Sequence, residues 1–394
     1  MSDPQVLIVG AGPAGADLAW RLAQAGTDVL LVDRLSDLRQ AAFSSAALPI
    51  AAVREHQLPE AVVAAPWCGW QLLGPGEQRR QWQAEQPLGA VLDFGALRHW
   101  MAQRASAAGA RVELGWCCEA WRPSAGGAQV TLRGPAGQRR ALNTRWLVDA
   151  TGQQRALLGD PSPEAHPLVS GVGVEWLLQV DPQRWGLWAD QLSFMLGSAW
   201  VPQGYGWVFP MRPGVLKLGI CRLQDPRRPQ PPLQGLLHQL QTRLGLADAT
   251  VLDRHGGLVR SSVLRREPHQ RGPVLGLGDA VSTANLLGGE GIRHALSSSA
   301  VLAPLLLAAL AGQPTALRAY PRRLRRRLGW RWSLSGRLAR RTWLGLQSPR
   351  ADRRLDHLLA ALEGCSAEDL SALLFDYRFE RYGLRALPYA LGLR

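Results

Sequence analysis

The 394-residue sequence is poor in cysteine and lysine and has no long uninterrupted apolar run. Its five cysteines have no regular spacing, which argues against a disulfide framework or a zinc site and favours a reducing, intracellular setting. The longest apolar run, residues 300–311, contains Pro304 and is shorter than the ~20 residues that a membrane-spanning helix needs. No signal peptide is recognisable before the first apolar strand, so we expect a cytoplasmic protein.

Acidic residues are missing from one strongly basic stretch. The chain carries a formal net charge of +14, and residues 318–341 include ten arginines and no acid. Leu324, Leu328 and Trp332 recur at every fourth position, which indicates a helix with one apolar face. Arginines interleaved with tryptophans are typical of an in-plane contact with anionic lipids, so we expect peripheral membrane contact through 318–346. A solvated basic face and nucleic-acid binding are the alternatives; no nucleic-acid recognition module is visible, and we expect no such partner.

Residues 5–34 combine a strand, a glycine-rich turn, a helix and a second strand that ends in an acid. Gly10, Gly12 and Gly15 follow the first strand with G-x-G-x-x-G spacing. Such glycines permit a tight turn, let a pyrophosphate approach the backbone and let the helix pack on the strand. Asp33, at the end of the second strand, is placed to accept hydrogen bonds from ribose hydroxyls, so the segment predicts an adenine-dinucleotide site. Further contacts are expected from Pro13, Ala14 and Arg34.

Two later segments have the same character. The first, WLVDATG, is an apolar strand that ends in Asp149 and a turn at Gly152. The second, residues 273–296, is a short strand ending in Gly278 and Asp279, then a glycine-rich loop at which a new helix begins. A helix N-terminus without bulky side chains suits the pyrimidine edge of a flavin, where negative charge collects on reduction. Nicotinamide enzymes have no use for this third segment, so the three together predict FAD. The loop residues expected to contact it are Gly288, Gly289, Gly291 and Ile292.

Aromatic residues are concentrated between the second and third segments. The stretch 160–265 has strand-like runs and predicts an antiparallel sheet that covers the cofactor. For any single tryptophan in it, a place in the sheet core is the simpler explanation. As a group they indicate a tunnel for an apolar or aromatic substrate, lined by Trp176, Phe194, Trp200 and Trp207.

The motifs GAGPAG with Asp33, VDATG, and GLGDA followed by GGEGI resemble those of the FAD-dependent geranylgeranyl reductase family. This family belongs with aromatic hydroxylases, lycopene cyclases and flavin halogenases in one superfamily. The segment YGWVFPMRPGVLKLG, residues 205–219, is similar to the family's Y-x-W-x-F-P element followed by a glycine-bearing strand. The resemblance implies that four residues on the substrate sheet face the flavin: Tyr205, Trp207, Phe209 and Pro210.

The sequence departs from the family pattern at three places. Asp93 stands where many relatives have an arginine that contacts FAD, so Arg98 is the candidate for that role. Ser44 and Ser45 occupy the early loop in which the family's reductases often carry a cysteine. Small residues there would let a flat ring lie against the backbone, and an ordinary helix start with serine as its cap is an equal alternative. Met211 stands where relatives usually have lysine after the F-P pair.

These observations predict an α/β fold in three parts. A Rossmann-like FAD-binding domain is expected from residues 1–160 together with 266–317, with a hairpin excursion at about 66–90. An antiparallel β-sheet substrate domain, 161–265, is inserted into it. A basic, helical C-terminal region, 318–394, follows.

The resemblance implies an FAD-dependent oxidoreductase that transfers hydride from reduced flavin to a carbon–carbon double bond of an isoprenoid. An isolated alkene also needs a proton on the adjacent carbon, in a site that excludes water. Candidate donors are Tyr205, Cys221, Glu290 and His294. Of these, Glu290 is better explained as fixing its loop, and His294 is equally well explained as a packing residue. Because only one dinucleotide fold is recognisable, NADPH or a reduced electron carrier is expected to act as external donor.

Three alternatives stay open at this stage. A lycopene-cyclase-like carotenoid enzyme shares the fold, but the cyclases' acidic F-L-E-E-T motif is missing. A flavin-dependent monooxygenase or halogenase on an apolar substrate is the second, although GWVFP only partly matches the halogenases' W-x-W-x-I-P. We also expect no lysine near the early flavin loop, since Lys217 is the only one in the chain. A flavoprotein that carries a pigment without turnover is the third.

Overall fold

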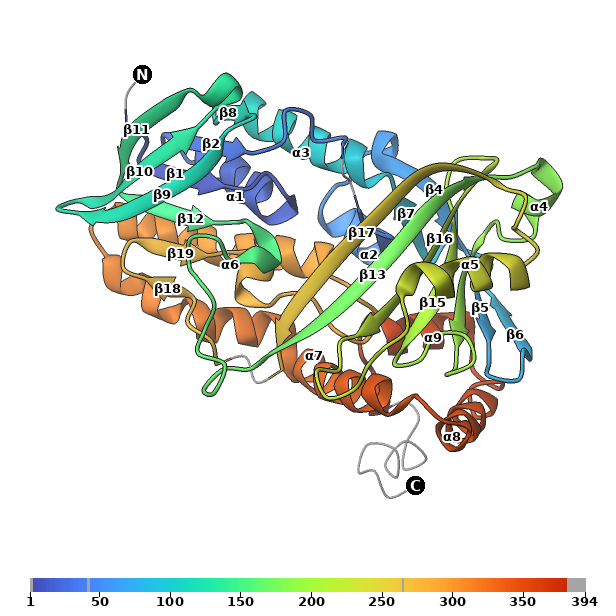
Figure 1. Ribbon diagram of the computed structural model, residues 1–394. Helices are drawn as coiled ribbons and strands as arrows, with labels where there is room; N and C mark the ends of the chain where they lie inside the picture. Colours follow the sequence, from blue (N-terminus) through green and yellow to red (C-terminus); the bar gives the residue numbers. More distant parts are fainter. Residues whose placement is uncertain (1–2, 41–42, 264–265, 381–394) are drawn as a thin grey trace.

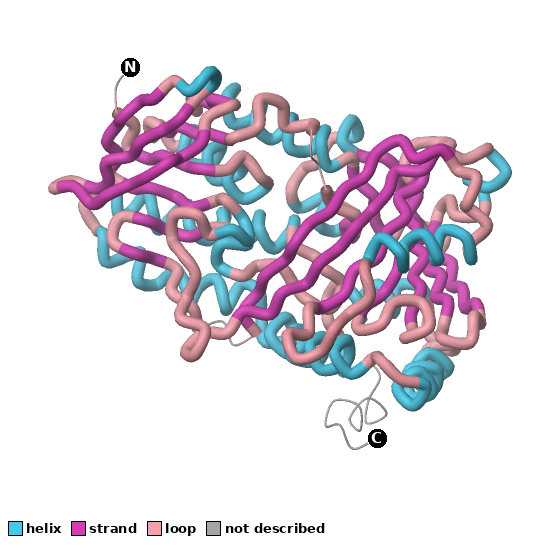
Figure 2. Tube along the Cα trace, in the orientation of Figure 1, coloured by secondary structure: helices cyan, strands magenta, loops and turns pink. Residues whose placement is uncertain are grey.

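The computed structural model describes residues 3–40, 43–263 and 266–380 of the chain. The molecule has two lobes, and its strands gather in two groups at opposite ends (Figures 1 and 2). The first lobe contains the nucleotide-binding segment predicted from the sequence, and the second contains the large sheet of the predicted substrate domain.

The first lobe is built on a six-stranded sheet in the order β18-β19-β12-β1-β2-β8. All neighbouring pairs are parallel except the edge pair of β18 and β19. The strands are β1 (Val6–Val9), β2 (Val29–Asp33), β8 (Arg111–Leu114), β12 (Trp146–Asp149), β18 (Gln270–Arg271) and β19 (Val274–Gly276). The helices α1 (Pro13–Gln24), α3 (Phe94–Ala107) and α6 (Ile292–Leu310) pack together in this lobe.

The apolar runs of β1 and β2 are explained by cover on both faces of their sheet. All four residues of β1 are buried, as expected for a parallel strand between two layers. Opposite the helices lies a small antiparallel sheet of β9 (Cys117–Ser124), β10 (Gly127–Arg133) and β11 (Arg139–Thr144). Its central strand alternates, so that Ala128, Val130 and Leu132 join the same core as β1.

The second lobe is a seven-stranded sheet in the order β17-β13-β16-β15-β14-β5-β6. Its strands are β5 (Gly69–Leu73), β6 (Arg79–Gln83), β13 (Leu168–Gln179), β14 (Gln191–Leu196), β15 (Gly204–Pro210), β16 (Val215–Leu223) and β17 (Thr250–Ser262). We expected residues 66–90 to form a hairpin excursion from the first domain. The hairpin exists as β5 and β6, but β5 pairs in parallel with β14 and so extends the substrate sheet. The sheet is therefore antiparallel except at that one pair.

The two faces of this sheet have different neighbours. One face packs against α5 (Leu233–Arg243) in a closed apolar core, and the short helix α4 (Pro182–Gly186) lies in the connection between β13 and β14. The opposite face is turned toward the first lobe and the C-terminal helices. A small three-stranded sheet joins the lobes; its strands are β3 (Ala47–Pro49), β7 (Gly89–Leu92) and β4 (Val63–Trp67). The short helix α2 (Ile50–Glu55) follows β3.

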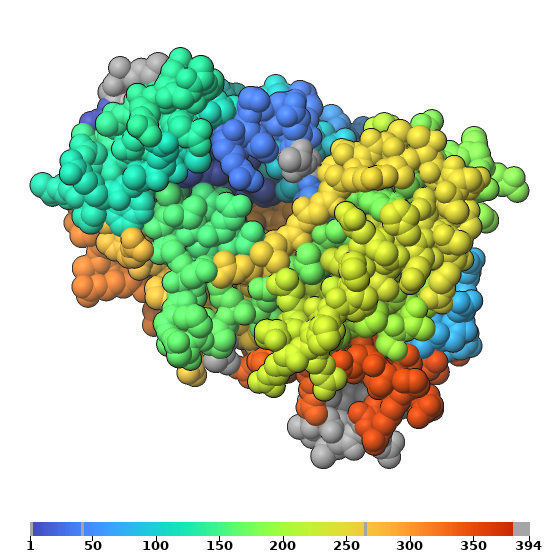
Figure 3. All heavy atoms as spheres, viewed as in Figure 1, coloured from blue at the N-terminus to red at the C-terminus, as the bar shows by residue number. Residues whose placement is uncertain are grey.

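The described C-terminal region is helical, as predicted. It comprises α7 (Tyr320–Gly345), which is interrupted at Gly329 (φ 83°), α8 (Pro349–Ala360) and α9 (Ala367–Leu374). Arginines of α7 are exposed, whereas Leu324 and Trp332 are buried. Figure 3 shows the orange-red atoms of this region below the substrate sheet. The region packs against the sheet instead of standing apart from the fold.

Within the described residues, α6 is one helix whose length and composition would allow it to cross a membrane. It covers 19 residues and includes positions 300–310 of the apolar run, preceded by turns that carry Arg293, His294 and three serines. However, 67% of its most apolar window is buried, and the helix packs between α1 and α7. Its apolarity is therefore that of a core helix.

Candidate active site

A cavity of about 1170 Å³ lies between the two lobes and the C-terminal helices. All three segments predicted to contact FAD reach it, together with the early serine loop and the cavity face of the substrate sheet. The predicted residues that line it are Gly12, Pro13, Ala14, Ser44, Ser45, Gly152, Phe194, Tyr205, Trp207, Phe209, Cys221, Gly278, Asp279, Gly288, Gly289, Glu290, Gly291 and Ile292. Segments far apart in the sequence thus border one cavity.

The first glycine loop is shaped by close backbone contacts. Gly10 has φ +109°, and a Cβ atom there would lie 2.3 Å from the carbonyl oxygen of Ala150. A Cβ at Gly15 would lie 2.0 Å from the carbonyl oxygen of Gly10. By contrast, a Cβ at Gly12 would meet nothing within 4 Å, because this residue faces the open cavity. The loop therefore offers bare backbone to a ligand at Gly12, as a bound pyrophosphate requires.

Asp33 closes this loop from the end of β2. One carboxylate oxygen accepts a hydrogen bond from the backbone N–H of Ala11 (2.7 Å), and the other accepts one from Leu35 (2.9 Å). The carboxylate thus lies against the glycine loop, at the place where an adenine ribose would be held. Arg98 lies outside the cavity lining: its guanidinium contacts the carbonyl oxygen of Gln40 (3.3 Å) and the ring of Phe94.

Asp149 has a different role from the one expected. Its side chain is fully buried and lies outside the cavity lining. One oxygen accepts hydrogen bonds from the N–H and hydroxyl of Thr151, and the other accepts from the N–H groups of Leu157 and Leu158 (2.9 and 2.8 Å). All the hydrogen bonds that the structure shows for this carboxylate are made with the loop that carries Gly152. Asp149 therefore shapes the loop of the second segment, and its side chain does not border the cavity.

The third segment meets the first at Gly278. This residue has φ +62°, and a Cβ there would lie 2.9 Å from the Cβ of Ala14 in the first segment. The neighbouring Asp279 lines the cavity, and its carboxylate accepts a hydrogen bond from the Thr283 hydroxyl (2.8 Å). Burial raises the pKa of Asp279, with the Thr283 hydrogen bond acting in the opposite direction. A buried acid at this position suits hydrogen bonding to a polar ligand chain.

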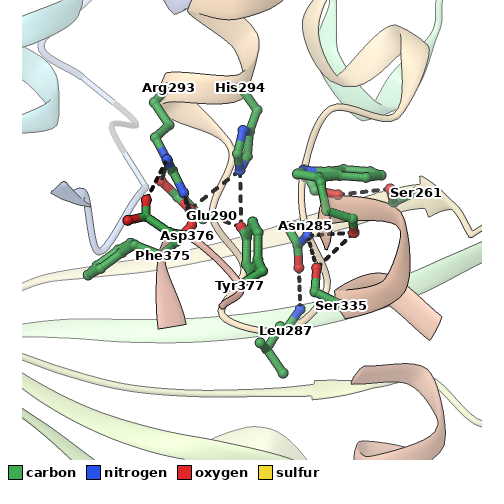
Figure 4. A network of polar contacts seen from close by, with 12 residues as sticks. Ser261, Asn285, Leu287, Glu290, Arg293, His294, Ser335, Phe375, Asp376 and Tyr377 are labelled. Carbon is green, nitrogen blue, oxygen red and sulfur yellow. Dashed lines mark hydrogen bonds and ion pairs between the residues drawn. The ribbon is translucent and has the colours of Figure 1, made fainter. Parts of the chain in front are cut away.

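A polar network holds the glycine-rich loop before α6 (Figure 4). The Tyr377 hydroxyl donates to Glu290 Oε2 (3.0 Å), and His294 Nε2 lies 3.1 Å from the same hydroxyl and 3.4 Å from Oε2. Arg293 pairs with Glu290 and also donates to the carbonyl oxygen of Phe375. The residues after α9 are therefore tied to the loop predicted to face the flavin.

The charges of this network argue against Glu290 as an acid. Burial alone would raise the pKa of Glu290, but Arg293 and His294 lower it to about 2. The carboxylate stays ionised at neutral pH and serves to fix the loop. His294 lies outside the cavity lining and acts within the same network.

Further contacts anchor the same loop to α7 and to the substrate sheet. Asn285 donates to the Ser335 hydroxyl (2.5 Å) on α7 and accepts from the backbone N–H of Leu287 (2.9 Å). Ser261 on β17 donates to the carbonyl oxygen of Ala284 (2.8 Å). Figure 4 shows these contacts beside the Glu290 network, so the loop is held from three sides.

The aromatic wall of the cavity follows the strand alternation of β15. Tyr205, Trp207 and Phe209 point to the cavity, whereas Val208 belongs to the core against α5. Pro210, the fourth residue expected to face the flavin, is buried outside the cavity lining because it falls on the alternate position. The indole N–H of Trp207 donates to Glu175 (2.9 Å), which fixes the plane of this ring.

Two groups on this wall keep their protons at neutral pH. Tyr205 and Cys221 lie opposite each other in the β15–β16 pair, and both line the cavity. Burial raises the pKa of Tyr205 well above its ordinary value and raises the pKa of Cys221 to about 12. A Cβ at Gly289 would lie 3.4 Å from the Tyr205 hydroxyl, so this hydroxyl reaches the loop of the third segment.

Trp176 and Trp200 are wrong as substrate contacts. Both belong to the core between the sheet and α5. The Trp176 ring contacts His238 of α5 (ring centroids 4.5 Å apart), and the Trp200 indole N–H donates to the carbonyl oxygen of Gly74 (2.9 Å). Alternation places Trp176 on the face of its strand that points away from the cavity.

Several lining residues were missed in the sequence. The apolar faces of α7, α8 and α9 close the cavity. Residues that line it from this side include Leu338, Trp343, Leu359, Leu370 and, directly after α9, Phe375. The sequence contained a pattern that could have revealed α8: leucines at 355, 358 and 359 in the helix, and at 362 just after it, follow helical spacing. It was obscured because the arginines of the preceding stretch indicated a separate surface helix.

The position of the single lysine corrects another expectation. Lys217 Nζ donates to the carbonyl oxygens of Ser44 (2.9 Å) and Ser45 (3.1 Å), so a lysine does lie beside the early flavin loop. Lys217 lies on β16, in the middle of the substrate sheet between β13 and β15. Its contact with a loop more than 170 residues earlier in the chain cannot be read from the sequence.

Comparison with known proteins supports the cofactor. The family description "FAD binding domain" matches residues 3–46, which contain the first glycine loop and Asp33. The computed structure is similar to a geranylgeranyl bacteriochlorophyll reductase-like protein from Thermoplasma acidophilum, with a TM-score of 0.80 and 20% identity over 99% of this chain and 100% of that chain. It is also similar in fold to the p-nitrophenol 4-monooxygenase PnpA from Pseudomonas putida, with a TM-score of 0.72 and 17% identity over 96% of this chain and 98% of that chain.

Sequence relatives point to one branch of this fold. The menaquinone reductase of Mycobacterium tuberculosis is 28% identical over 346 residues, which cover 85% of this chain and 83% of the relative. The digeranylgeranylglycerophospholipid reductase of Haloferax volcanii is 26% identical, over 76% of this chain and 74% of the relative. The geranylgeranyl diphosphate reductase of Rhodobacter capsulatus is 24% identical, over 79% of this chain and 77% of the relative. Taken with the three segments that border one cavity, these similarities show that the chain is an FAD-dependent oxidoreductase that resembles the geranylgeranyl reductases.

Proposed function

We propose that the protein is an FAD-dependent oxidoreductase that reduces carbon–carbon double bonds of an isoprenoid chain. The observation that carries this proposal is the cavity itself: glycine-bearing loops border one side, and aromatic and aliphatic side chains line the rest. Its volume of about 1170 Å³ exceeds the ~300–1,000 Å³ of ordinary small-molecule pockets, so there is room for a long apolar chain beside a cofactor. The reductase names of the sequence relatives agree with this assignment.

The residues of the first lobe are proposed to hold the cofactor. Gly12 and the N-terminus of α1 would bind the pyrophosphate, and Asp33 would bind the ribose. The loop before α6, residues 288–292, would face the isoalloxazine ring. Bound FAD would supply the hydride that adds to one carbon of the double bond.

Tyr205 and Cys221 are the proposed source of the proton for the second carbon. Both line the cavity and both stay protonated at neutral pH because burial raises the pKa of each. Glu290 is ionised and His294 lies outside the lining, so they fit this role less well. The surrounding apolar walls would exclude water, which a proton transfer to an alkene requires.

Access from a membrane and an external reductant complete the proposal. Trp330 is 63% exposed, the Arg331 guanidinium lies over its ring, and the other arginines of α7 are exposed; this combination suits contact with anionic lipid through 318–346. NADPH or a reduced electron carrier would reduce the flavin. Sedimentation with vesicles of anionic or neutral lipid tests the contact: binding to anionic vesicles that weakens with salt is expected, and equal binding to both would contradict it.

The reductase assignment is tested with the purified protein under anaerobic conditions. The bound flavin is reduced with NADPH or with dithionite that is not in excess, and geranylgeranyl diphosphate or a digeranylgeranylglycerophospholipid is then added. We expect reoxidation of the flavin only with a polyprenyl substrate, and a product mass increased by two hydrogens for each reduced bond. Unchanged substrates in both cases would overturn the assignment, as would rapid oxygen consumption with a hydroxylated product when the reaction is repeated in air.

A further inference from the structure

The single lysine of the chain lies at a junction between the two lobes. The sequence has 45 lysine and arginine residues together, and only Lys217 is a lysine. It is located on β16, opposite Phe209 of β15 and Leu177 of β13, and only 4% of the residue is exposed. A cation at such depth calls for a specific set of partners.

Those partners are three backbone carbonyl groups of the first lobe and its connecting sheet. Lys217 Nζ donates to the carbonyl oxygens of Ser44 (2.9 Å), Ser45 (3.1 Å) and Leu92 (3.2 Å). An ammonium group has three N–H donors, so three acceptors match its charged form. An arginine carries its N–H donors on three nitrogens of a planar group, so it cannot donate to all three carbonyl oxygens from a single nitrogen atom.

A charge–charge interaction with Glu175 links Lys217 to the aromatic wall. Glu175 on β13 is 1% exposed, and it accepts the indole N–H of Trp207. Burial lowers the pKa of Lys217, while Glu175 and Asp93 raise it; burial raises the pKa of Glu175, while Lys217 lowers it. Lys217 is thus the positive member of a buried group that includes a ring of the substrate wall.

The loop that Lys217 holds is itself a wall of the cavity. Residues 43–48 line it, and the Phe43 ring lies over a floor without side chains at Gly257 and Gly173. A displacement of the carbonyl groups at 44 and 45 would therefore move the cavity wall. A fixed positive charge in a site of low dielectric constant also favours nearby negative charge more strongly than in water.

We propose that Lys217 is a positioning residue that fixes the loop 43–48 to the substrate sheet and holds a positive charge beside the flavin site. The inference rests on the proposed FAD-dependent reductase function. Loss of this side chain would weaken FAD binding and disfavour the reduced, more negative cofactor. A side chain that merely fills space would change neither the redox equilibrium nor the response to a charge-preserving substitution.

The test compares Lys217→Met and Lys217→Arg with wild-type holoprotein. Arg254→Met is the matched control, since Arg254 lies on the same sheet and stacks on Trp176 at the face away from the cavity. We expect Lys217→Met to raise the Kd for FAD at least ten-fold. Its flavin potential should fall by about 30 mV, which corresponds to a ten-fold change in a two-electron equilibrium. Lys217→Arg should restore the potential more than the affinity, and the control should change neither.

Chemical labelling of the wild-type protein supplies an independent measurement. Because Lys217 carries the only ε-amino group, an amine-directed acylating reagent can modify only this side chain and the α-amino group, and peptide mass spectrometry separates the two sites. We expect acylation in the native holoprotein to be at least 100-fold slower than in the urea-unfolded chain. This result is decisive even where Lys217→Met does not fold.

Two results would overturn the proposal. The first is a Kd and a flavin potential in Lys217→Met that stay within two-fold and a few millivolts of wild type. The second is acylation of Lys217 in the native protein at the rate of the unfolded chain. Neither measurement uses an isoprenoid, so failure here is distinguishable from failure of the proposed reductase activity, which shows as unchanged substrate.

Discussion

The two faces of the seven-stranded sheet are built from the same kinds of residue and serve different purposes. Trp176 and Trp207 are each 4% exposed and lie on neighbouring parts of the same sheet. Trp176 packs against α5 in a closed core, whereas Trp207 borders the cavity. The exposed fraction of a side chain therefore does not distinguish a structural aromatic residue from a substrate contact. What distinguishes them is whether that face of the sheet packs against a helix or borders the cavity.

The two faces also differ in how they are closed. The α5 face is sealed by direct apolar packing. The cavity face is covered by α7–α9, whose end is tied to the flavin-side loop through Glu290, Arg293 and Tyr377. Polar contacts at the end of a cover can open at lower cost than a packed core, which suits entry of a long substrate.

The largest expected effect is that of Trp176→Ala. Removing a fully packed indole should lower the free energy of unfolding by about 4 kcal/mol, with an unchanged KM for the isoprenoid in the folded fraction. Trp207→Ala should cost about 2 kcal/mol, since its ring already borders a void, and should raise the KM about ten-fold. Urea unfolding and steady-state kinetics of both variants check this pair. Equal effects on stability and KM would show that the two faces do not differ as described.

Glu290→Gln should destabilise the cover of the cavity by about 3 kcal/mol at neutral pH, because the half-buried Arg293 loses its nearest charge partner and keeps the more distant Asp376 (3.8 Å). The pKa of Glu290 is lowered from 4.5 to about 2 in the folded protein, so its stabilisation is complete above about pH 4.5 and is lost as the pH falls toward 2.

The gap in unfolding free energy between wild type and Glu290→Gln should therefore narrow over that pH window. Glu77→Gln, at an exposed ion pair with Arg243, serves as the control and should change stability by less than ~1 kcal/mol. A gap that stays constant from pH 6 to pH 3 would contradict the assignment of an ionised Glu290.

Gly219→Ala and Gly206→Ala place one methyl group on each face. A Cβ at Gly219 would lie 2.1 Å from the Trp207 ring, so the ring must move within the cavity. We expect kcat/KM for the isoprenoid to fall about ten-fold, which corresponds to ~1.4 kcal/mol. A Cβ at Gly206 would lie 2.8 Å from the end of the Leu240 side chain on the other face, and should change stability by about 1 kcal/mol and kcat/KM hardly at all. The reverse ranking in kinetics would contradict the assignment of the faces.

Tyr377→Phe is the smallest change and removes one hydroxyl from the cover. The variant loses the hydrogen bond to Glu290, which should cost about 1 kcal/mol in the free energy of unfolding. Thermal unfolding of the holoprotein measures it. No change at all would indicate that the segment after α9 does not hold the loop.

Local patterns explain why the first lobe was predictable. The glycine spacing, the apolar strands and Asp33 lie within about thirty residues, and each has a direct backbone reason. The resemblance of residues 205–210 to the family's element assigned Tyr205, Trp207 and Phe209 to the flavin side, and the alternation of β15 places these three on one face. Pro210, one position further, was assigned to the cavity against that same alternation.

The errors share a cause in long-range packing. Asp149 ends an apolar strand like Asp33, and both carboxylates accept backbone N–H groups, but Asp149 is fully buried under the turn that follows it, whereas Asp33 is half-buried. The basic stretch before α8 predicted a surface helix, and its arginines are indeed exposed, but its apolar side faces the cavity.

The order of amino acids was enough to establish the nucleotide-binding strand, turn and helix and the set of residues on each side of a strand, because these depend on backbone geometry within a few neighbours. It could not establish which side of the sheet meets the cavity, that helices some 150 residues further along close it, or that Lys217 reaches the carbonyl groups of Ser44 and Ser45. Those features arise when distant segments pack, since burial and charge pairing depend on neighbours that the linear pattern does not specify.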